Sequence, residues 1–373
     1  MKIKIAVLGA NAPLIPFYKQ AHNLGYEIIG IAVEEGAVCK QYCDRFYPIS
    51  FADKDKVVEV CRKENVNGIL SFSLESALPT VTYVAQKLGL VSNTEESIKL
   101  TQSKFAQRQA LEASGIPVPK YYQISSEDDI KSINCNFPVI VKPVDSGGSQ
   151  GICKVDVPDK LIEAYRYAKE YSRTENVIVE EYIDGREFSV EYISHNGKHY
   201  FLQITDKVTS GAPRFVEMQH HQPADIPFSV WQRIKSTVEA SLKALKIENS
   251  ASHTEIKWNN NDELYIIETG ARMGGDYITS DLVRLSTGYD FVDGTIKLAT
   301  GNFEIPVKPI EMYSGVYFYS KLAPEIGNVI LNHESYPEIV EWEYSDKPLM
   351  EVKSNADRRG YFLYQNLNHK LII

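Results

Sequence analysis

Short apolar runs alternate with amphipathic stretches through roughly the first ninety residues, and this alternation constrains the fold more than any other feature. Apolar runs of this length are typical of buried strands, and apolar residues at helical spacing are typical of helices that cover a sheet. Strands separated by helices form βαβ units around a parallel sheet, so an α/β unit is predicted at the N-terminus. The predicted strands are 3–8, 27–33 and 68–72, and the predicted helices are 16–24, 54–64 and 78–88.

The rest of the chain is expected to form further units. Its 373 residues are enough for two or three compact units, each with its own core. A helix around 99–114 opens a strand-rich stretch, which contains two more predicted helices, at 161–171 and 230–245. The last stretch is short and mostly β. The predicted boundaries are 1–95, 96–308 with a central subdomain at about 115–185, and 309–373.

Charge and cysteine usage restrict the partners. A net charge of −9 argues against a nucleic-acid or anionic-membrane binder, because both usually require a basic face. No segment approaches the length of a membrane span. The five cysteines include no CxxC pair and no metal-ligand spacing, so free thiols in a cytoplasmic protein are expected.

A strand that ends on a lysine leads directly into a glycine-rich loop. Residues 137–142 read FPVIVK, and the loop that follows places glycine at 147, 148 and 151. Such a loop can fold closely over an anion, with its backbone N–H groups aimed at phosphate oxygens. The loop is not a P-loop, and a surface turn with a solvated Lys142 is the alternative.

A second apolar strand, which starts at Val177, runs into the carboxylates of Glu180 and Glu181 and a turn, and an alternating strand is predicted to start near Glu187. Adenine requires a donor and an acceptor from a backbone edge, which residues 180–183 can supply. Ribose hydroxyls favour a carboxylate, which Glu187 can supply. An exposed acidic hairpin is the alternative interpretation.

Two β-patterned runs, 252–258 and 263–268, flank an Asn/Asp-rich turn and predict an antiparallel hairpin. With the turn centred on 260–261, Glu268 would face His253, and Glu255 would be its diagonal neighbour on the same face. Two carboxylates on one face repel each other unless a cation lies between them, and Mg²⁺ takes one or two carboxylates together with phosphate oxygens. The hairpin therefore predicts a magnesium site at Glu255 and Glu268. Shortly after it, Arg272 could clamp a transferring phosphoryl group, or form a structural salt bridge.

Together, and in this order, these motifs resemble the ATP-grasp superfamily, and most closely its carboxylate–amine (L-amino-acid) ligase branch. The resemblance covers nearly the whole chain. It implies an α/β fold, α+β in the grasp portion, with a Rossmann-like parallel-sheet domain at the N-terminus. Central and ATP-grasp domains and a small β-rich C-terminal domain would follow.

The resemblance also implies roles for individual residues. Lys104 and Lys142 would bind ATP phosphates together with the loop backbone at Ser146, Gly147, Gly148, Ser149 and Gly151. Glu181 and Ile183 would offer backbone to adenine, Glu180 would accept from its amino group, and Glu187 would hold ribose. Glu255 and Glu268 would ligate Mg²⁺ or Mn²⁺, and Arg272 would steady an acyl phosphate. In a loop that resembles the substrate loop of amino-acid ligases, Glu217 and His220 would contact the substrates.

The expected activity is ATP-dependent coupling of a small carboxylate, such as an amino acid, to an amine. One departure from the family pattern is Gly270, where many members carry a metal-ligating Asn. Two alternatives stay open: a carboxylase or carbamoyl-phosphate-like synthase that uses bicarbonate, and a non-catalytic ATP-binding protein. No nucleic acid or membrane partner is expected, and dimers are common among proteins that resemble this one, so a homodimer is compatible with the resemblance.

Overall fold

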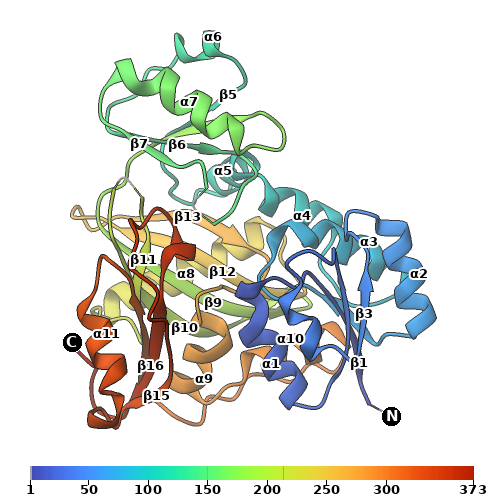
Figure 1. Cartoon of the computed structure of the whole chain (residues 1–373). Helices are drawn as coiled ribbons and strands as arrows, with labels where there is room; N and C mark the ends of the chain where they lie inside the picture. Colours follow the sequence, from blue (N-terminus) through green and yellow to red (C-terminus); the bar gives the residue numbers. More distant parts are fainter. Residues whose placement is uncertain (1, 149, 213) are drawn as a thin grey trace.

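The computed structural model describes residues 2–148, 150–212 and 214–373 (Figure 1). At the N-terminus four parallel strands form a sheet in the order β3-β2-β1-β4. Both faces are buried: Ile5 and Val7 of β1 belong to one core, and Ala6 and Leu8 belong to another. The predicted α/β unit is confirmed. The elements are β1 Lys4–Leu8, α1 Ile15–Asn23, β2 Glu27–Ala32, β3 Arg45–Pro48, α2 Lys54–Glu64, β4 Gly68–Leu70 and α3 Leu78–Leu88.

The helix predicted around 99–114 is two helices, α4 (Glu95–Gln102) and α5 (Lys104–Ala113). They are separated at Ser103, whose backbone is extended and whose hydroxyl accepts from the Ala106 N–H at 3.3 Å. Serine favours this capping position over a helix interior, because its side chain satisfies a free N–H of the first turn. The break places Lys104 at the first position of α5.

A small four-stranded antiparallel sheet, in the order β5-β8-β6-β7, projects from the rest of the molecule at the top of Figure 1. Helix α7, predicted at 161–171, packs on it through Leu161, Ala164, Tyr165 and Ala168. Strand β6 carries Lys142, and the glycine-rich loop follows. The elements are β5 Tyr121–Ile124, α6 Glu127–Ile130, β6 Val139–Pro143, β7 Cys153–Val155, α7 Leu161–Glu170 and β8 Val177–Glu181.

An eight-stranded antiparallel sheet, in the order β13-β12-β9-β10-β11-β14-β16-β15, forms the largest layer. Its last three strands come from the C-terminal stretch, so the sheet continues across the boundary predicted at residue 309. Among the described residues no helix is long and apolar enough to cross a membrane. The elements are β9 Arg186–His195, β10 Lys198–Thr209, β11 Glu217–Gln222, α8 Phe228–Ala244, β12 Ser250–Trp258, β13 Leu264–Gly270, α9 Val283–Thr287, α10 Phe291–Ala299, β14 Tyr313–Tyr319, α11 Glu325–Leu331, β15 Ile339–Tyr344 and β16 Gly360–Asn366.

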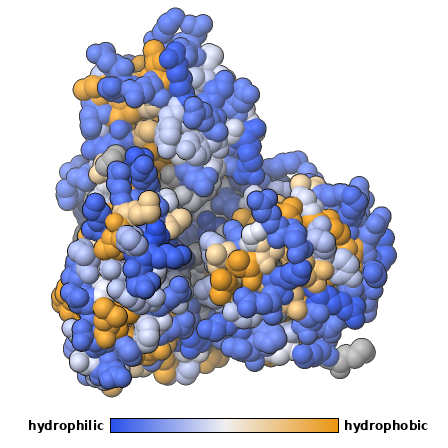
Figure 2. Space-filling view, viewed as in Figure 1, coloured by the Kyte–Doolittle hydropathy of each residue, from blue (hydrophilic) through white to orange (hydrophobic). Residues whose placement is uncertain are grey.

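Side chains alternate across this sheet, and the alternation separates core from site. Phe188, Val190, Ile256 and Ile266 face a core covered by α8. The residues that alternate with these point to the opposite face, where Glu187 of β9 and Glu255 of β12 share a cavity with residues of the projecting sheet. The surface is hollowed between the N-terminal unit, the projecting sheet and the C-terminal strands (Figure 2).

Candidate nucleotide and metal site

A small cavity of about 110 Å³ lies between the projecting sheet and the eight-stranded sheet. Apolar walls from Ile140, Ile152, Phe215 and Ile267 surround it, and charged side chains stand at its rim. An apolar slot with a few polar groups is the usual character of a site for a planar ring. Seven residues predicted from the sequence line it: Lys142, Glu180, Glu181, Ile183, Glu187, Glu217 and Glu255.

Glu180 is held by two cations. Arg108 of α5 donates from Nε and Nη2 to its carboxylate at 2.8 and 3.2 Å, and Lys142 Nζ lies 2.7 Å from Oε2. Burial alone would raise the pKa of Glu180, but Arg108 and Lys142 outweigh it and lower the pKa to about 2. Both carboxylate oxygens are already bonded. The expected contact with an adenine amino group would therefore require one of these bonds to be exchanged.

Lys104 connects three parts of the site. Its Nζ donates to the Ser146 carbonyl at 2.6 Å and lies 2.9 Å from Glu268 Oε1. The glycine-rich loop therefore begins directly beside the proposed metal ligand. Gly147 and Gly148 are exposed, Gly151 is buried, and Ser149 lies outside the described residues.

The register of the β12–β13 hairpin differs from the prediction. Glu268 lies opposite Glu255, and Gly270 takes the place opposite His253 that was expected for Glu268. The pairing shifts between Glu255 and Ile256, where a β-bulge adds an extra residue to β13. Directly opposed residues point to the same face of a sheet, so the two carboxylates are closer neighbours than the predicted diagonal pair.

Lys207 of β10 was not predicted as a site residue, yet it stands among three carboxylates. Its Nζ lies 2.7 Å from Glu187, 2.7 Å from Glu255 and 3.2 Å from Glu217. Burial would lower the pKa of Lys207, but the three carboxylates outweigh it and raise the pKa well above its usual range. Oxygens of these carboxylates also lie within 4.8 Å of one another, an alternative cation site that excludes Glu268.

Glu255 is also close to His253, whose Nε2 lies 3.8 Å from it. Buried Glu191 contacts the other ring nitrogen at 2.6 Å. Burial would lower the pKa of His253, but Glu191 outweighs it and the pKa rises to about 9, so the ring is a cation at neutral pH. Gly274 permits this packing, because a Cβ there would lie 2.5 Å from Nδ1 of the ring.

Arg272 lies at the junction with the N-terminal unit. Its Nη2 lies 3.5 Å from Glu75, which begins the short 3₁₀ helix Glu75–Ala77 after β4 and was not predicted for the site. Burial, aided by Glu268, raises the pKa of Glu75 although Arg272 opposes the rise. A Cβ at position 270 would lie 3.3 Å from Arg272 Nε, so glycine there leaves room for the arginine side chain to fold back.

Glu217 and His220 meet next to a loop from the C-terminal stretch. The Glu217 carboxylate lies 3.8 Å from His220 Nε2, and the backbone N–H of Glu217 donates to Asn355 Oδ1 at 3.0 Å. Asn355 also donates to Asp276 at 3.0 Å, and Arg358 contacts Asp276 at 2.5 Å. Burial raises the pKa of Glu217 to about 7 and lowers the pKa of His220 to about 3, so the histidine is neutral and the carboxylate titrates near neutrality.

The segment that carries most of these residues is similar to a known domain family. Residues 135–281 match the ATP-grasp domain family. The chain contains an ATP-grasp domain. The matched segment begins just before β6 and ends after β13, so it includes Lys142, Glu180, Glu187, Glu255 and Glu268.

Individual proteins agree with this assignment. The chain is 27% identical over 264 residues to the carbamoyl phosphate synthase large chain of Thermotoga petrophila, which covers 66% of this chain and 23% of that protein. It is 23% identical over 245 residues to the alanine–anticapsin ligase of Bacillus subtilis, and this match covers 59% of this chain and 51% of that protein. The crystal structure of an L-amino acid ligase from Bacillus licheniformis superposes with a TM-score of 0.81 at 22% identity, and the superposition covers 99% of this chain and 94% of that chain. The chain spans between 23% and 63% of the length of the curated relatives it matches, and the structural likeness establishes the fold.

Proposed function

We propose that this protein is an ATP-dependent ligase that joins a carboxylate to an amine through an acyl phosphate, with release of ADP and phosphate. The observation that carries the proposal is the pairing of Glu255 with Glu268 on one face of the sheet. Lysines stand beside both carboxylates, and Arg272 follows at the end of the same strand. The small carboxylate and amine substrates are expected to enter from the hollow beside Arg272.

The residues fit a divalent cation. Glu255 is anionic at neutral pH: burial opposes ionisation, but Lys207 and His253 hold its pKa well below its usual range. Hard oxygen ligands of this kind suit Mg²⁺ or Mn²⁺. When bound at Glu255 and Glu268, the ion would offset negative charge on the ATP phosphates. Lys104 and Lys142 would bind the same phosphates from the side of the glycine-rich loop.

The nucleotide base would occupy the apolar cavity under the projecting sheet. Glu181 and Ile183 lie at its rim and would offer backbone groups to adenine, with Glu180 near the amino group. Glu187 lines this cavity and also belongs to the group of carboxylates formed with Glu217 and Glu255, and there it would hold ribose. The backbone of the loop over Ser146–Gly151 would close over the phosphates and exclude water, which otherwise hydrolyses an acyl phosphate.

The chemical steps follow from these positions. An oxygen of the substrate carboxylate attacks the γ-phosphorus of ATP, and ADP leaves. Arg272 stabilises the charge on the acyl phosphate. The ammonium group of the second substrate gives a proton to Glu217, and the free amine attacks the carbonyl carbon and displaces phosphate. Glu217 suits this transfer better than His220, because its pKa of about 7 matches the working pH.

A matrix of carboxylic acids and amines, assayed for phosphate release with mass spectrometry of each hit, tests the proposal. Acid carrying ¹⁸O in its carboxylate should transfer one ¹⁸O to the released phosphate, because a carboxylate oxygen bridges to phosphorus in the intermediate. Phosphate without the label would contradict an acyl phosphate. Bicarbonate-dependent ATP cleavage without another acid would instead indicate the carboxylase or carbamoyl-phosphate-like activity. Tight ATP binding with no ADP release in the whole matrix would indicate a non-catalytic protein.

A further inference from the structure

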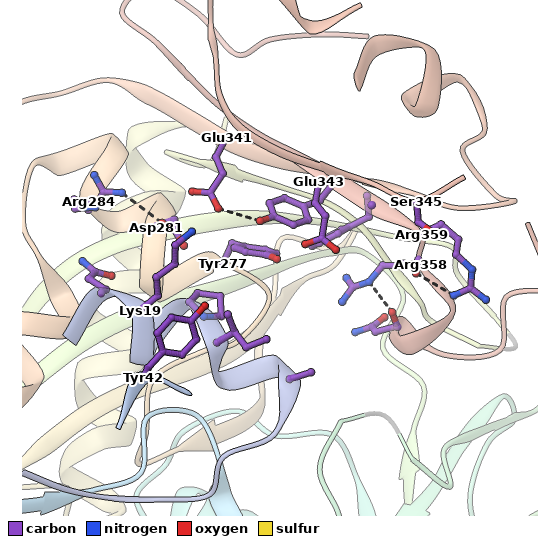
Figure 3. A pocket seen from close by; sticks show the side chains of 18 of the residues that line it. Lys19, Tyr42, Tyr277, Asp281, Arg284, Glu341, Glu343, Ser345, Arg358 and Arg359 are labelled. Carbon is purple, nitrogen blue, oxygen red and sulfur yellow. Dashed lines mark hydrogen bonds and ion pairs between the residues drawn. The ribbon is translucent and has the colours of Figure 1, made fainter. Parts of the chain in front are cut away.

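A large cavity lies outside the ATP-grasp pocket, between α1 of the N-terminal unit and the C-terminal strands β15 and β16 (Figure 3). Its volume of about 960 Å³ is at the upper end of the range for small-molecule sites. Arg272, Glu255 and Glu268 do not line it, so it adjoins the proposed reaction centre without containing the phosphate site.

One end of the cavity touches the proposed base. Asn355 and Arg358 line this end, Asn355 accepts from the Glu217 N–H, and both side chains contact Asp276. The Arg358 guanidinium lies 3.8 Å from the centroid of the Phe318 ring. Its Nη1 is buried, and no described residue accepts a hydrogen bond from it. A buried, unpartnered guanidinium N–H favours an anionic ligand group close to the point where the amine must react.

The other end has the opposite character. Tyr277 and Tyr361 stack with ring centroids 4.2 Å apart, and the Tyr361 hydroxyl donates to Glu341 at 3.0 Å. Glu341 and Glu343 alternate on the edge strand β15, and in Figure 3 both descend toward Tyr277. Aromatic rings flanked by carboxylates favour a cation.

The ionic groups of the lining do not cancel at this end. Asp281 already has a partner, since Arg284 contacts it at 3.4 Å. Lys19 reaches into the cavity from α1 on an exposed side chain. The lining as a whole has five bases against four acids, but Arg358 and Arg359 lie together at the first end (Figure 3). Without these two arginines the acids exceed the bases by one: Asp281, Asp290, Glu341 and Glu343 against Lys19, Arg284 and Lys347.

We propose that this cavity holds the acceptor amine, and that the acceptor is an α-amino acid with a long cationic side chain. The α-carboxylate binds Arg358, which places the α-amino group beside Glu217. The side-chain cation reaches the Tyr277–Tyr361 pair and the carboxylates of Glu341 and Glu343. In the reaction the α-ammonium loses one proton to Glu217, and its nitrogen attacks the carbonyl carbon and forms the amide bond. Phosphate leaves with the electrons of the broken C–O bond and takes the second proton from the nitrogen, so that one proton remains on the amide. This inference rests on the proposed ligase function.

Calorimetry with three probes and without turnover tests the cavity itself. L-Arginine contains both recognised charges, agmatine lacks the α-carboxylate, and L-norleucine lacks the side-chain cation. We expect arginine to bind at least about tenfold more tightly than either other probe, the equivalent of about 1.4 kcal/mol for each lost ionic contact. The double variant E341Q/E343Q should abolish the preference over norleucine, and Arg358→Met the preference over agmatine. Arg358→Lys should restore part of the latter.

The control is Glu334→Gln, which removes an exposed acid of the same lobe outside the lining and should change nothing. ATP affinity, measured in parallel, should stay at the wild-type value in E341Q/E343Q. Equal affinity for the three probes would overturn the inference. Amide formation with small neutral amines at a rate that is the same in the wild type and in E341Q/E343Q would also overturn the inferred acceptor site. That result would leave the ligase function intact. Absence of ADP formation with every acid would overturn the ligase function, and the acceptor role with it.

Discussion

Arg108 is fully buried and forms two hydrogen bonds to Glu180, so its removal is the most informative perturbation of the fold beneath the nucleotide site. Arg108→Met keeps an unbranched apolar side chain of about the length of the aliphatic part of arginine, and removes the guanidinium with its charge. Loss of one partner of a buried ion pair costs about 3–5 kcal/mol, because it leaves an uncompensated charge. Lys142 remains 2.7 Å from Glu180 and still compensates part of its charge. We therefore expect a loss of unfolding free energy at the lower end of this range, about 3 kcal/mol.

The pKa of Glu180 reports the net effect of burial, Arg108 and Lys142, and this net effect has the same order of magnitude. Its value of about 2 lies below the usual 4.5, and at about 1.4 kcal/mol per pH unit the difference corresponds to about 3 kcal/mol. A depressed carboxyl pKa stabilises the folded state above pH 4.5, and the contribution is lost as the pH falls toward 2. The wild type should therefore lose more stability over this range than Arg108→Met, whose Glu180 no longer has its strongest partner.

Urea unfolding at pH 7, followed by circular dichroism, measures the change in the free energy of unfolding. The matched control is Lys99→Met, which removes the cation of an exposed pair with Glu95 on the adjacent helix α4, at an N···O distance of 2.9 Å against 2.8 Å for Arg108–Glu180. Exposed pairs of this kind contribute little. If Arg108→Met were no less stable than Lys99→Met, the conclusion that Arg108 neutralises a buried carboxylate would be refuted.

Three further outcomes are expected. Glu268→Ala should abolish ADP formation while its circular dichroism spectrum stays native, and near-normal turnover would defeat the metal assignment. Lys142→Ala should weaken ATP binding in calorimetry by about tenfold or more, the effect of one lost charged contact, and unchanged affinity would contradict its phosphate role. Because Glu217 must be ionised to accept a proton and its pKa is about 7, kcat/KM should fall as the pH drops below 7; in Glu217→Gln this limb should disappear, and a limb that persists would assign it to another group.

Motifs in one stretch of chain could be located from the sequence, because a local pattern carries their signal. The strand that ends on Lys142 and the hairpin with two glutamates are examples, and both form as predicted. The hairpin register could not be predicted, because the β-bulge between Glu255 and Ile256 has no distinct residue pattern. The bulge changes the pairing of the two strands, and the sequence alone does not show where it occurs.

Residues contributed by distant segments were missed. Lys207, Glu75 and Asn355 reach the site from β10, the N-terminal unit and the C-terminal stretch, and nothing nearby in the sequence distinguishes them from solvated polar residues. Glu75 had one usable signal: it follows a strand of a parallel sheet, and ligands of such sheets lie outside the carboxyl ends of the strands. For Lys207 the three carboxylates around it are brought together only by the sheet.

Anomalous scattering from Mn²⁺ in crystals grown with a non-hydrolysable ATP analogue tests directly whether Glu255 and Glu268 hold the metal beneath ATP. We predict a peak in bonding contact with one oxygen of each carboxylate, at about 2.0–2.2 Å, and loss of this peak in Glu268→Ala. A peak among Glu187, Glu217 and Glu255, with Lys207 displaced and Glu268 free, would contradict this metal assignment.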